Sequence, residues 1–136
     1  MRIVRIHGAD PEVYTTIGPF AMDHDVIRKR EHLPIITKPT YTWHVLMEGQ
    51  KVKAFVGVEE IISYTKLQAF FVLEATKTEC RTLIKEVVEK FKRTNSPKLT
   101  AAVLKEYEEL FVKEKFEVTR YRKNWTELTF FRYEES

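Results

Sequence analysis

Few side chains in this 136-residue sequence combine the type and the position that acid–base chemistry needs. Glu59 and Glu60 close one apolar stretch, and Glu74 closes the next. A carboxylate at the end of a strand is usually a solvated surface group. Where it loses solvent, its pKa rises and it can accept a proton near neutral pH. If the protein is an enzyme, we expect Glu59 or Glu74 to be its base.

The histidine and cysteine residues do not form a metal-binding pattern. Metal sites need several ligands at regular spacing, and the four histidines lack it: His7, His24, His32 and His44. We therefore expect no metal. Cys80 is the single cysteine and falls on the apolar face of a predicted helix, so core packing is its expected role. For His44 we expect a hydrogen-bonded structural role.

The composition predicts one globular domain over residues 1–136. Hydrophobic residues make up 43%, with 4 Gly and 5 Pro, which excludes a disordered chain. No apolar run approaches the ~20 residues of a membrane-spanning helix, and the N-terminus lacks the pattern of a signal peptide. One cysteine fits a reducing compartment. We expect a cytoplasmic protein that does not bind membranes.

Two basic segments could contact nucleic acid, although the net charge of +3 does not require such a partner. One is Arg28-Lys29-Arg30, and the other is the mixed run Arg120-Tyr121-Arg122-Lys123-Asn124-Trp125. The second interleaves cations with aromatic rings that could stack on bases. We favour solvated surfaces for both, and a nucleic-acid partner stays open.

Apolar periodicity predicts an α+β fold with a single mixed, mostly antiparallel sheet flanked by helices. Seven strands are expected, at Arg2–His7, Tyr41–Glu48, Lys51–Glu59, Lys66–Glu74, Lys98–Val103, Phe116–Arg122 and Trp125–Tyr133. Helical stretches are expected to begin near Asp10 and Asp23, with a break at Gly18-Pro19, and again near Leu104.

The strongest helical signal lies between the fourth and fifth predicted strands. Apolar residues recur there on one helical face, at Cys80, Leu83, Ile84, Val87, Val88 and Phe91. The preceding Thr76-Lys77-Thr78-Glu79 has the pattern of a capping box. We expect this helix to pack on the sheet.

In its order of elements the chain resembles the GCN5-related N-acetyltransferase (GNAT) superfamily over nearly its whole length. Val56-Gly57-Val58 resembles the hydrophobic-Gly-hydrophobic segment of the family's third strand. The run from Tyr107 to Val118 resembles the family's FYEKLGFEV ending. The resemblance implies an acetyltransferase that uses acetyl-CoA to acetylate an amine of a small molecule, a protein or a nucleobase.

The resemblance also implies positions for the acetyl-CoA site. The backbone of Phe71, Val72 and Leu73 would hold the pantetheine arm. Around the pyrophosphate it implies side chains of Lys77 and Arg81 with backbone amides of Thr78, Glu79, Cys80 and Arg81. Helix-start amides and the positive end of a helix dipole are the usual anion site.

Two departures from the family pattern concern chemistry. The junction from Leu73 to Thr82 contains no glycine, whereas the family has a Gln/Arg-x-x-Gly-x-Gly/Ala loop there. Phe111 stands where many members have the tyrosine that protonates the leaving thiolate. Tyr107 lies one helical turn earlier and could reach the same region, although a half-buried core role is the simpler interpretation.

Two hypotheses therefore stay open. One is a GNAT-fold N-acetyltransferase, and the alternative is a non-catalytic GNAT-fold binding protein with a protein or nucleic-acid partner, such as a phage or mobile element encodes. A homodimer is compatible with both. A separation between the strands at 66–74 and 98–103 would favour the enzyme. If the turn amides prove to be satisfied by Thr76 or blocked by Glu79, the catalytic hypothesis falls and only the assignment of the scaffold remains.

Overall fold

The computed structural model describes residues 1–132 of the chain. Its elements follow in the order β1 (Arg2–His7), α1 (Glu12–Thr16), α2 (Gly18–Ala21), α3 (His24–Lys29), β2 (Tyr41–Glu48), β3 (Lys51–Glu60), β4 (Thr65–Val72), α4 (Lys77–Lys92), β5 (Lys98–Leu104), the 3-10 helix η1 (Lys105–Tyr107), α5 (Glu108–Lys113), β6 (Glu117–Tyr121) and β7 (Trp125–Phe131).

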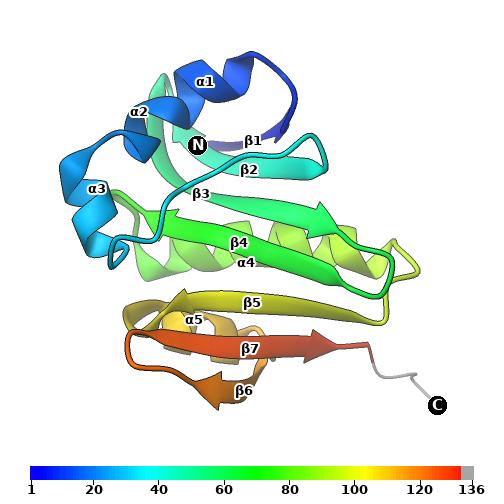
Figure 1. The fold of residues 1–136 in the computed structure, drawn as a ribbon. Helices are drawn as coiled ribbons and strands as arrows, with labels where there is room; N and C mark the ends of the chain where they lie inside the picture. The colour runs from blue at the N-terminus through cyan, green and yellow to red at the C-terminus, as the bar shows by residue number, and fades with distance from the viewer. Residues whose placement is uncertain (133–136) are drawn as a thin grey trace.

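All seven strands form one sheet, in the order β1-β2-β3-β4-β5-β7-β6. Neighbouring strands are antiparallel except β4 and β5, which are parallel. The sheet therefore consists of a four-stranded block and a three-stranded block, joined along β4 and β5 (Figure 1). The connection from β4 to β5 runs through α4, as a parallel pair requires.

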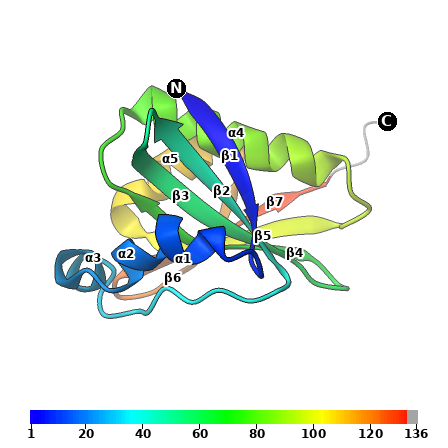
Figure 2. The ribbon, with the colours of Figure 1, turned by 90° about the horizontal axis from the view of Figure 1, so that it is seen from above.

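Helices cover both faces of the sheet. In Figure 2, α4 and α5 lie on one side, and α1, α2 and α3 lie on the other. The predicted apolar stripe of α4 is buried from Cys80 to Phe91. On the opposite face the Phe20 ring of α2 stacks on Phe55 of β3, with 5.7 Å between ring centroids. The core is thus formed on both sides of the central strands.

Gly57 of β3 lies under the aromatic residues of β2. A Cβ atom at this position would be 3.3 Å from Cδ2 of Tyr41 and 3.4 Å from the Trp43 ring. Tyr41 and Trp43 are both buried. A larger residue at 57 would therefore press on a tightly packed ring pair.

The predicted α+β class and element order are confirmed, with small differences in strand ends. β4 ends at Val72 rather than Glu74, because the amides of Leu73 and Glu74 both donate to the carbonyl of Lys53 and turn the chain. Tyr133, predicted to end the last strand, lies outside the described residues. Within residues 1–132, no helix has both the length and the apolar character needed to cross a membrane.

Candidate functional site

β4 and β5 are paired along only part of their length. Their register contains three residue pairs, from Thr65 with Leu99 to Leu67 with Ala101. Beyond these pairs β4 continues to Val72 and β5 to Leu104, and the two ribbons separate toward their arrowheads in Figure 1. The strand separation that an acyltransferase would need is present. We call it the β4–β5 opening.

A bulge in β4 accompanies the opening. Phe55 pairs with Phe71 and Gly57 with Gln68, so two residues of β4, Ala69 and Phe70, lie opposite one residue of β3. Ala69 has a φ of 54°, in the left-handed region of backbone conformation that residues other than glycine rarely adopt. Because a bulge bends its strand and increases the local twist, it directs the end of β4 away from β5.

Tyr107 reaches the opening from η1. Its phenolic oxygen accepts a hydrogen bond from the backbone N–H of Val72, at 3.2 Å. Its ring packs edge-on against Phe70, with 5.1 Å between centroids. Burial raises the pKa of Tyr107 to about 12. The hydroxyl therefore stays protonated at neutral pH and can serve as a proton donor.

A cavity of about 200 Å³ lies beside Tyr107 on the α4 side of the opening. It brings together four residues predicted for the site, namely Val72, Lys77, Cys80 and Tyr107. The remaining wall comes from Ala75 and from η1 and α5, including Glu106, Glu109, Leu110 and Lys113. Burial raises the pKa of the Cys80 thiol, so this side chain contributes a neutral surface rather than a thiolate nucleophile.

A second cavity, of about 260 Å³, lies on the α3 side of the same opening. β4 contributes Gln68 and the bulged Ala69, and β5 contributes Ala102. The lining also includes Arg30, at the end of α3, and Trp125, at the start of β7. The two cavities thus lie on opposite faces of the sheet beside the β4–β5 opening, and β4 contributes residues to both, Val72 to the first and Gln68 and Ala69 to the second.

At the turn from β4 to α4, several backbone amides already donate hydrogen bonds to groups of the turn itself. Thr76 Oγ1 accepts from the amide of Glu79 at 3.1 Å, and Glu79 Oε1 accepts from the amide of Thr76 at 2.9 Å, which completes the predicted capping box. The amide of Cys80 donates to the carbonyl of Thr76 at 3.0 Å. The amides of Glu79 and Cys80, expected at a pyrophosphate, are therefore not free, and at these two positions the condition stated above against the catalytic hypothesis is met. The first two helical amides, of Lys77 and Thr78, are those that a helix leaves without an intrahelical acceptor.

Ion pairs hold three charged side chains that were predicted to act at the site. Glu74 pairs with Lys51, which lowers the pKa of Glu74 and makes it a weaker base. Arg81 Nε is 2.6 Å from Glu114 Oε2. Glu79 is contacted by Lys53 Nζ at 3.1 Å, and the Thr76 amide and this ammonium lower the pKa of Glu79. Its carboxylate therefore stays charged where a phosphate would have to bind.

The other predicted residues lie around the opening rather than in it. Phe71 is buried against Phe55, with 6.1 Å between ring centroids. The amide of Leu73 donates to the carbonyl of Lys53. Glu59 accepts a hydrogen bond from Thr40 Oγ1 at 2.6 Å. In the strand register it lies opposite Lys66, which lines the α3-side cavity. Glu59 is therefore next to this cavity but does not line it.

Phe111, which replaces the family's tyrosine, is a core residue. It is fully buried, and its ring packs edge-on against Phe70 and Phe116 at 5.0 and 5.2 Å. The hydroxyl at the opening comes instead from Tyr107, one turn earlier. Whether Tyr107 performs the acid role stays a prediction.

Sequence reasoning missed Arg30 and Ala69. Arg30 belongs to the basic run at 28–30 that we expected on a solvated surface, and that expectation is wrong for this residue, because it is only 2% exposed. Arg28 and Lys29 are exposed, as expected. No local sequence signal could have identified either residue. An alanine in a strand gives no indication of a bulge, and the residues around an arginine in the sequence do not show whether its side chain is buried.

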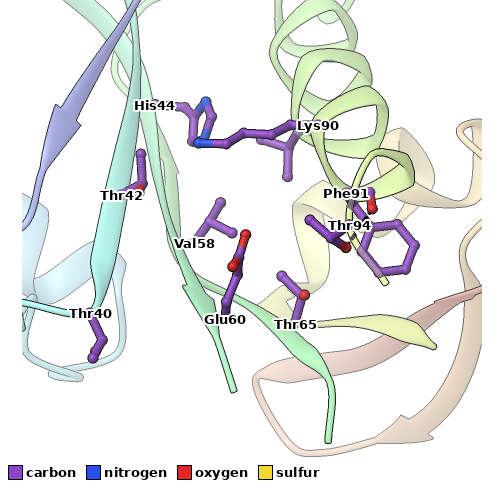
Figure 3. Close-up of a pocket in the computed structure, with 10 residues that line it drawn as sticks. Thr40, Thr42, His44, Val58, Glu60, Thr65, Lys90, Phe91 and Thr94 are labelled. Atoms are coloured by element: carbon purple, nitrogen blue, oxygen red, sulfur yellow. Dashed lines mark hydrogen bonds between the residues drawn. The ribbon is translucent and has the colours of Figure 1, made fainter. Parts of the chain in front are cut away.

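A third cavity, of about 140 Å³, lies away from the opening between the β2–β4 block and the end of α4 (Figure 3). His44 is fully buried and its Nδ1 is 3.1 Å from Glu86 Oε2, which agrees with the expected hydrogen-bonded role. His44 Nε2 and Thr65 Oγ1 have no hydrogen-bond partner in the described structure. Burial lowers the pKa of His44 more than Glu86 raises it, so its imidazole is neutral at pH 7.

The sequence matches no protein-family model and no curated protein. Its structure, however, is similar to solved structures, among them acetyltransferases. Escherichia coli ElaA has a TM-score of 0.71 and 8% identity, over 95% of this chain and 99% of that one. A GNAT family acetyltransferase from Elizabethkingia anophelis with acetyl-CoA bound has 0.63 and 13%, over 96% and 97%. Campylobacter jejuni N-acetyltransferase PseH in complex with acetyl coenzyme A has 0.62 and 11%, over 97% and 100%.

Proposed function

Because the chain has the GNAT fold of these acetyltransferases, we propose that it is an N-acyltransferase that transfers an acetyl group from acetyl-CoA to an amine. The observation that carries this proposal is the pair of cavities on opposite faces of the β4–β5 opening. A donor in the α4-side cavity and an acceptor in the α3-side cavity meet through the opening. The acetyl donor and the amine can therefore approach from opposite faces without passing through the hydrogen-bonded part of β4 and β5.

The α4-side cavity suits the arm of acetyl-CoA better than its diphosphate. The arm would lie along Val72 and exchange the Tyr107 hydroxyl at the Val72 amide for one of its own oxygens. The diphosphate would meet the Glu79 carboxylate, with the amides of Lys77 and Thr78 and the ammonium of Lys77 as its binding groups. We therefore expect weak binding that depends mainly on the arm. Acetyl-CoA supplies the activated acyl group.

The residues of this chain would then move two protons. Tyr107, freed from the Val72 amide and still protonated, donates its hydroxyl proton to the sulfur that leaves the acyl carbon. The acceptor ammonium must lose a proton before its nitrogen can attack. We assign this role to Glu59, acting through water from beside the α3-side cavity, rather than to Glu74, which Lys51 holds.

The variant Tyr107→Phe tests the catalytic part of the proposal. The phenylalanine keeps the packing against Phe70 and loses the hydroxyl. We expect native mass spectrometry to show acetyl-CoA bound to both proteins, and CoA release in the presence of a panel of amines to fall about 100-fold in the variant. Tyr121→Phe, at a 64% exposed tyrosine, is the matched control and should retain full activity. Equal rates for Tyr107→Phe and the wild type would refute the acid role.

A non-catalytic binding protein is the second candidate, and the closed capping box at Thr76 and Glu79 favours it. It predicts that no acetyl-CoA adduct forms at millimolar concentration. The same spectra report whether the chain is a homodimer. A nucleic-acid partner would be recognised by a steep loss of affinity with rising salt and by weaker binding of Arg122→Ala.

A further inference from the structure

Arg30 is a buried cation whose hydrogen bonds are incomplete. It caps the end of α3, and Glu31 and His32, both with positive φ, turn the chain back over it. The guanidinium Nε donates to the carbonyl of Leu33 at 3.2 Å, whereas Nη1 is buried and has no hydrogen-bond partner in the described structure. A guanidinium keeps its charge at neutral pH. A buried donor on a charged group is costly to leave unpaired.

Within the part of the chain that the structure describes, no acidic side chain pairs with this charge. None of the ion pairs found within residues 1–132 involves Arg30. The α3-side cavity that it lines contains a second cation, Lys66, and no carboxylate among its described lining residues. The guanidinium carbon of Arg30 lies over the Trp125 ring, 5.5 Å from its centroid. The guanidinium thus lines the cavity with one side near an aromatic ring and with Nη1 lacking a hydrogen-bond partner.

Apart from Lys66 and Gln68, the rest of the cavity lining is apolar. Leu33 and Ile36 line it while remaining 49% and 54% exposed, so their side chains form an uncovered hydrophobic rim. A ligand that fits has one anionic end and an apolar body. At about 260 Å³, the cavity suits a molecule of about amino-acid size rather than a larger one.

We propose that the α3-side cavity binds a carboxylate, held by the guanidinium of Arg30 with Lys66 as the second cation of the lining, so that the acetyl acceptor is a small amine with a carboxylate and an apolar body. This substrate class rests on the proposed acetyl transfer, whereas the carboxylate site itself does not. With its carboxylate on Arg30, the acceptor extends past Ala69 and Ala102 and presents its amine to the β4–β5 opening.

Titration with phenylacetate, phenylacetamide and phenylphosphonate tests the site in the absence of acetyl-CoA. Binding is followed through tryptophan fluorescence, since Trp125 lies under Arg30 and Trp43 is fully buried elsewhere. We expect phenylacetate to bind at least 10-fold more tightly than phenylacetamide, because only the carboxylate completes the charged hydrogen bond. Arg30→Met should lose at least 10-fold in phenylacetate affinity. Arg28→Gln, at an exposed arginine two residues earlier in α3, should lose none.

Equal affinities for the acid and the amide, or an Arg30→Met variant that binds phenylacetate as the wild type does, would overturn the proposal. If phenylphosphonate binds at least 10-fold more tightly than phenylacetate, the site recognises a phosphate group rather than a carboxylate, and the proposal is overturned. If Arg30→Met does not fold, the comparison of the three probes on wild-type protein still decides. The titrations contain no acetyl-CoA, so their outcome does not depend on whether the protein binds acetyl-CoA. Failure of the carboxylate site and failure of the proposed acetyl transfer are therefore distinguishable.

Discussion

Opening the capping box at the start of α4 should lower stability and raise affinity for acetyl-CoA. Thr76→Ala removes the Oγ1 acceptor of the Glu79 amide. Loss of such a cap costs about 1 kcal/mol, which for a domain of this size lowers Tm by about 3 to 5 °C. The same change leaves the amide of Glu79 free for an anion.

Glu79→Gln separates the effect of charge from that of hydrogen bonding. The glutamine oxygen can still accept from the amide of Thr76, but the negative charge next to the diphosphate is gone. For two phosphate charges about 7 Å from the carboxylate in water, the lost repulsion corresponds to about a sevenfold gain in affinity. Lys53, no longer neutralised by Glu79, should add to this gain.

The measurement is isothermal titration calorimetry with acetyl-CoA, beside acetyl-pantetheine, which has no diphosphate. Glu79→Gln should strengthen only the first. Glu89→Gln, at an exposed glutamate of α4 that pairs with Lys92, controls for net charge. A change of less than twofold in Glu79→Gln, or an equal gain in the control, would show that the carboxylate does not oppose the diphosphate. The account of the turn would then be wrong.

Two further predictions concern the folded state. Burial lowers the pKa of His44 below its ordinary 6.5 despite Glu86, with Lys90 and Arg5 also lowering it. The unfolded chain then binds the proton first, so urea unfolding should show full stability well above pH 6.5 and a loss of stability as the pH falls through about 6.5 toward the lower pKa of the folded state. An equal loss in His44→Gln would contradict this origin. Ala69→Val should lower the unfolding free energy by about 1–2 kcal/mol, because a β-branched residue fits poorly at a φ of 54°. Ala69→Gly should not, and unchanged unfolding of the valine variant would argue against strain at the bulge.

Much of the fold was predictable because its signals are local. The spacing of apolar residues from Cys80 to Phe91 depends only on helical period, and this face is buried as predicted. The capping box needs only Thr76 and Glu79 three residues apart, and both of its hydrogen bonds form. The helix predicted from Asp10 is likewise interrupted near Gly18-Pro19, since α1 ends at Thr16 and these two residues begin α2.

The candidate site was predictable only in part. Sequence reasoning selected Val72, Lys77, Cys80 and Tyr107, and these line one cavity. It did not show that Lys51 and Glu114 hold Glu74 and Arg81, because ion-pair partners 23 and 33 residues away depend on which elements come to lie side by side.

The sequence by itself determined the elements, their order and the face that each presents to the core, since these follow from periodicity and short-range capping. Only the tertiary structure decided where β4 leaves β5, because a strand register and its bulge depend on pairing with distant residues. It alone also decided that Arg30 is buried over Trp125, since that contact joins α3 to a strand almost a hundred residues later. Both features are long-range, and together they shape the opening and the unpaired cation beside it.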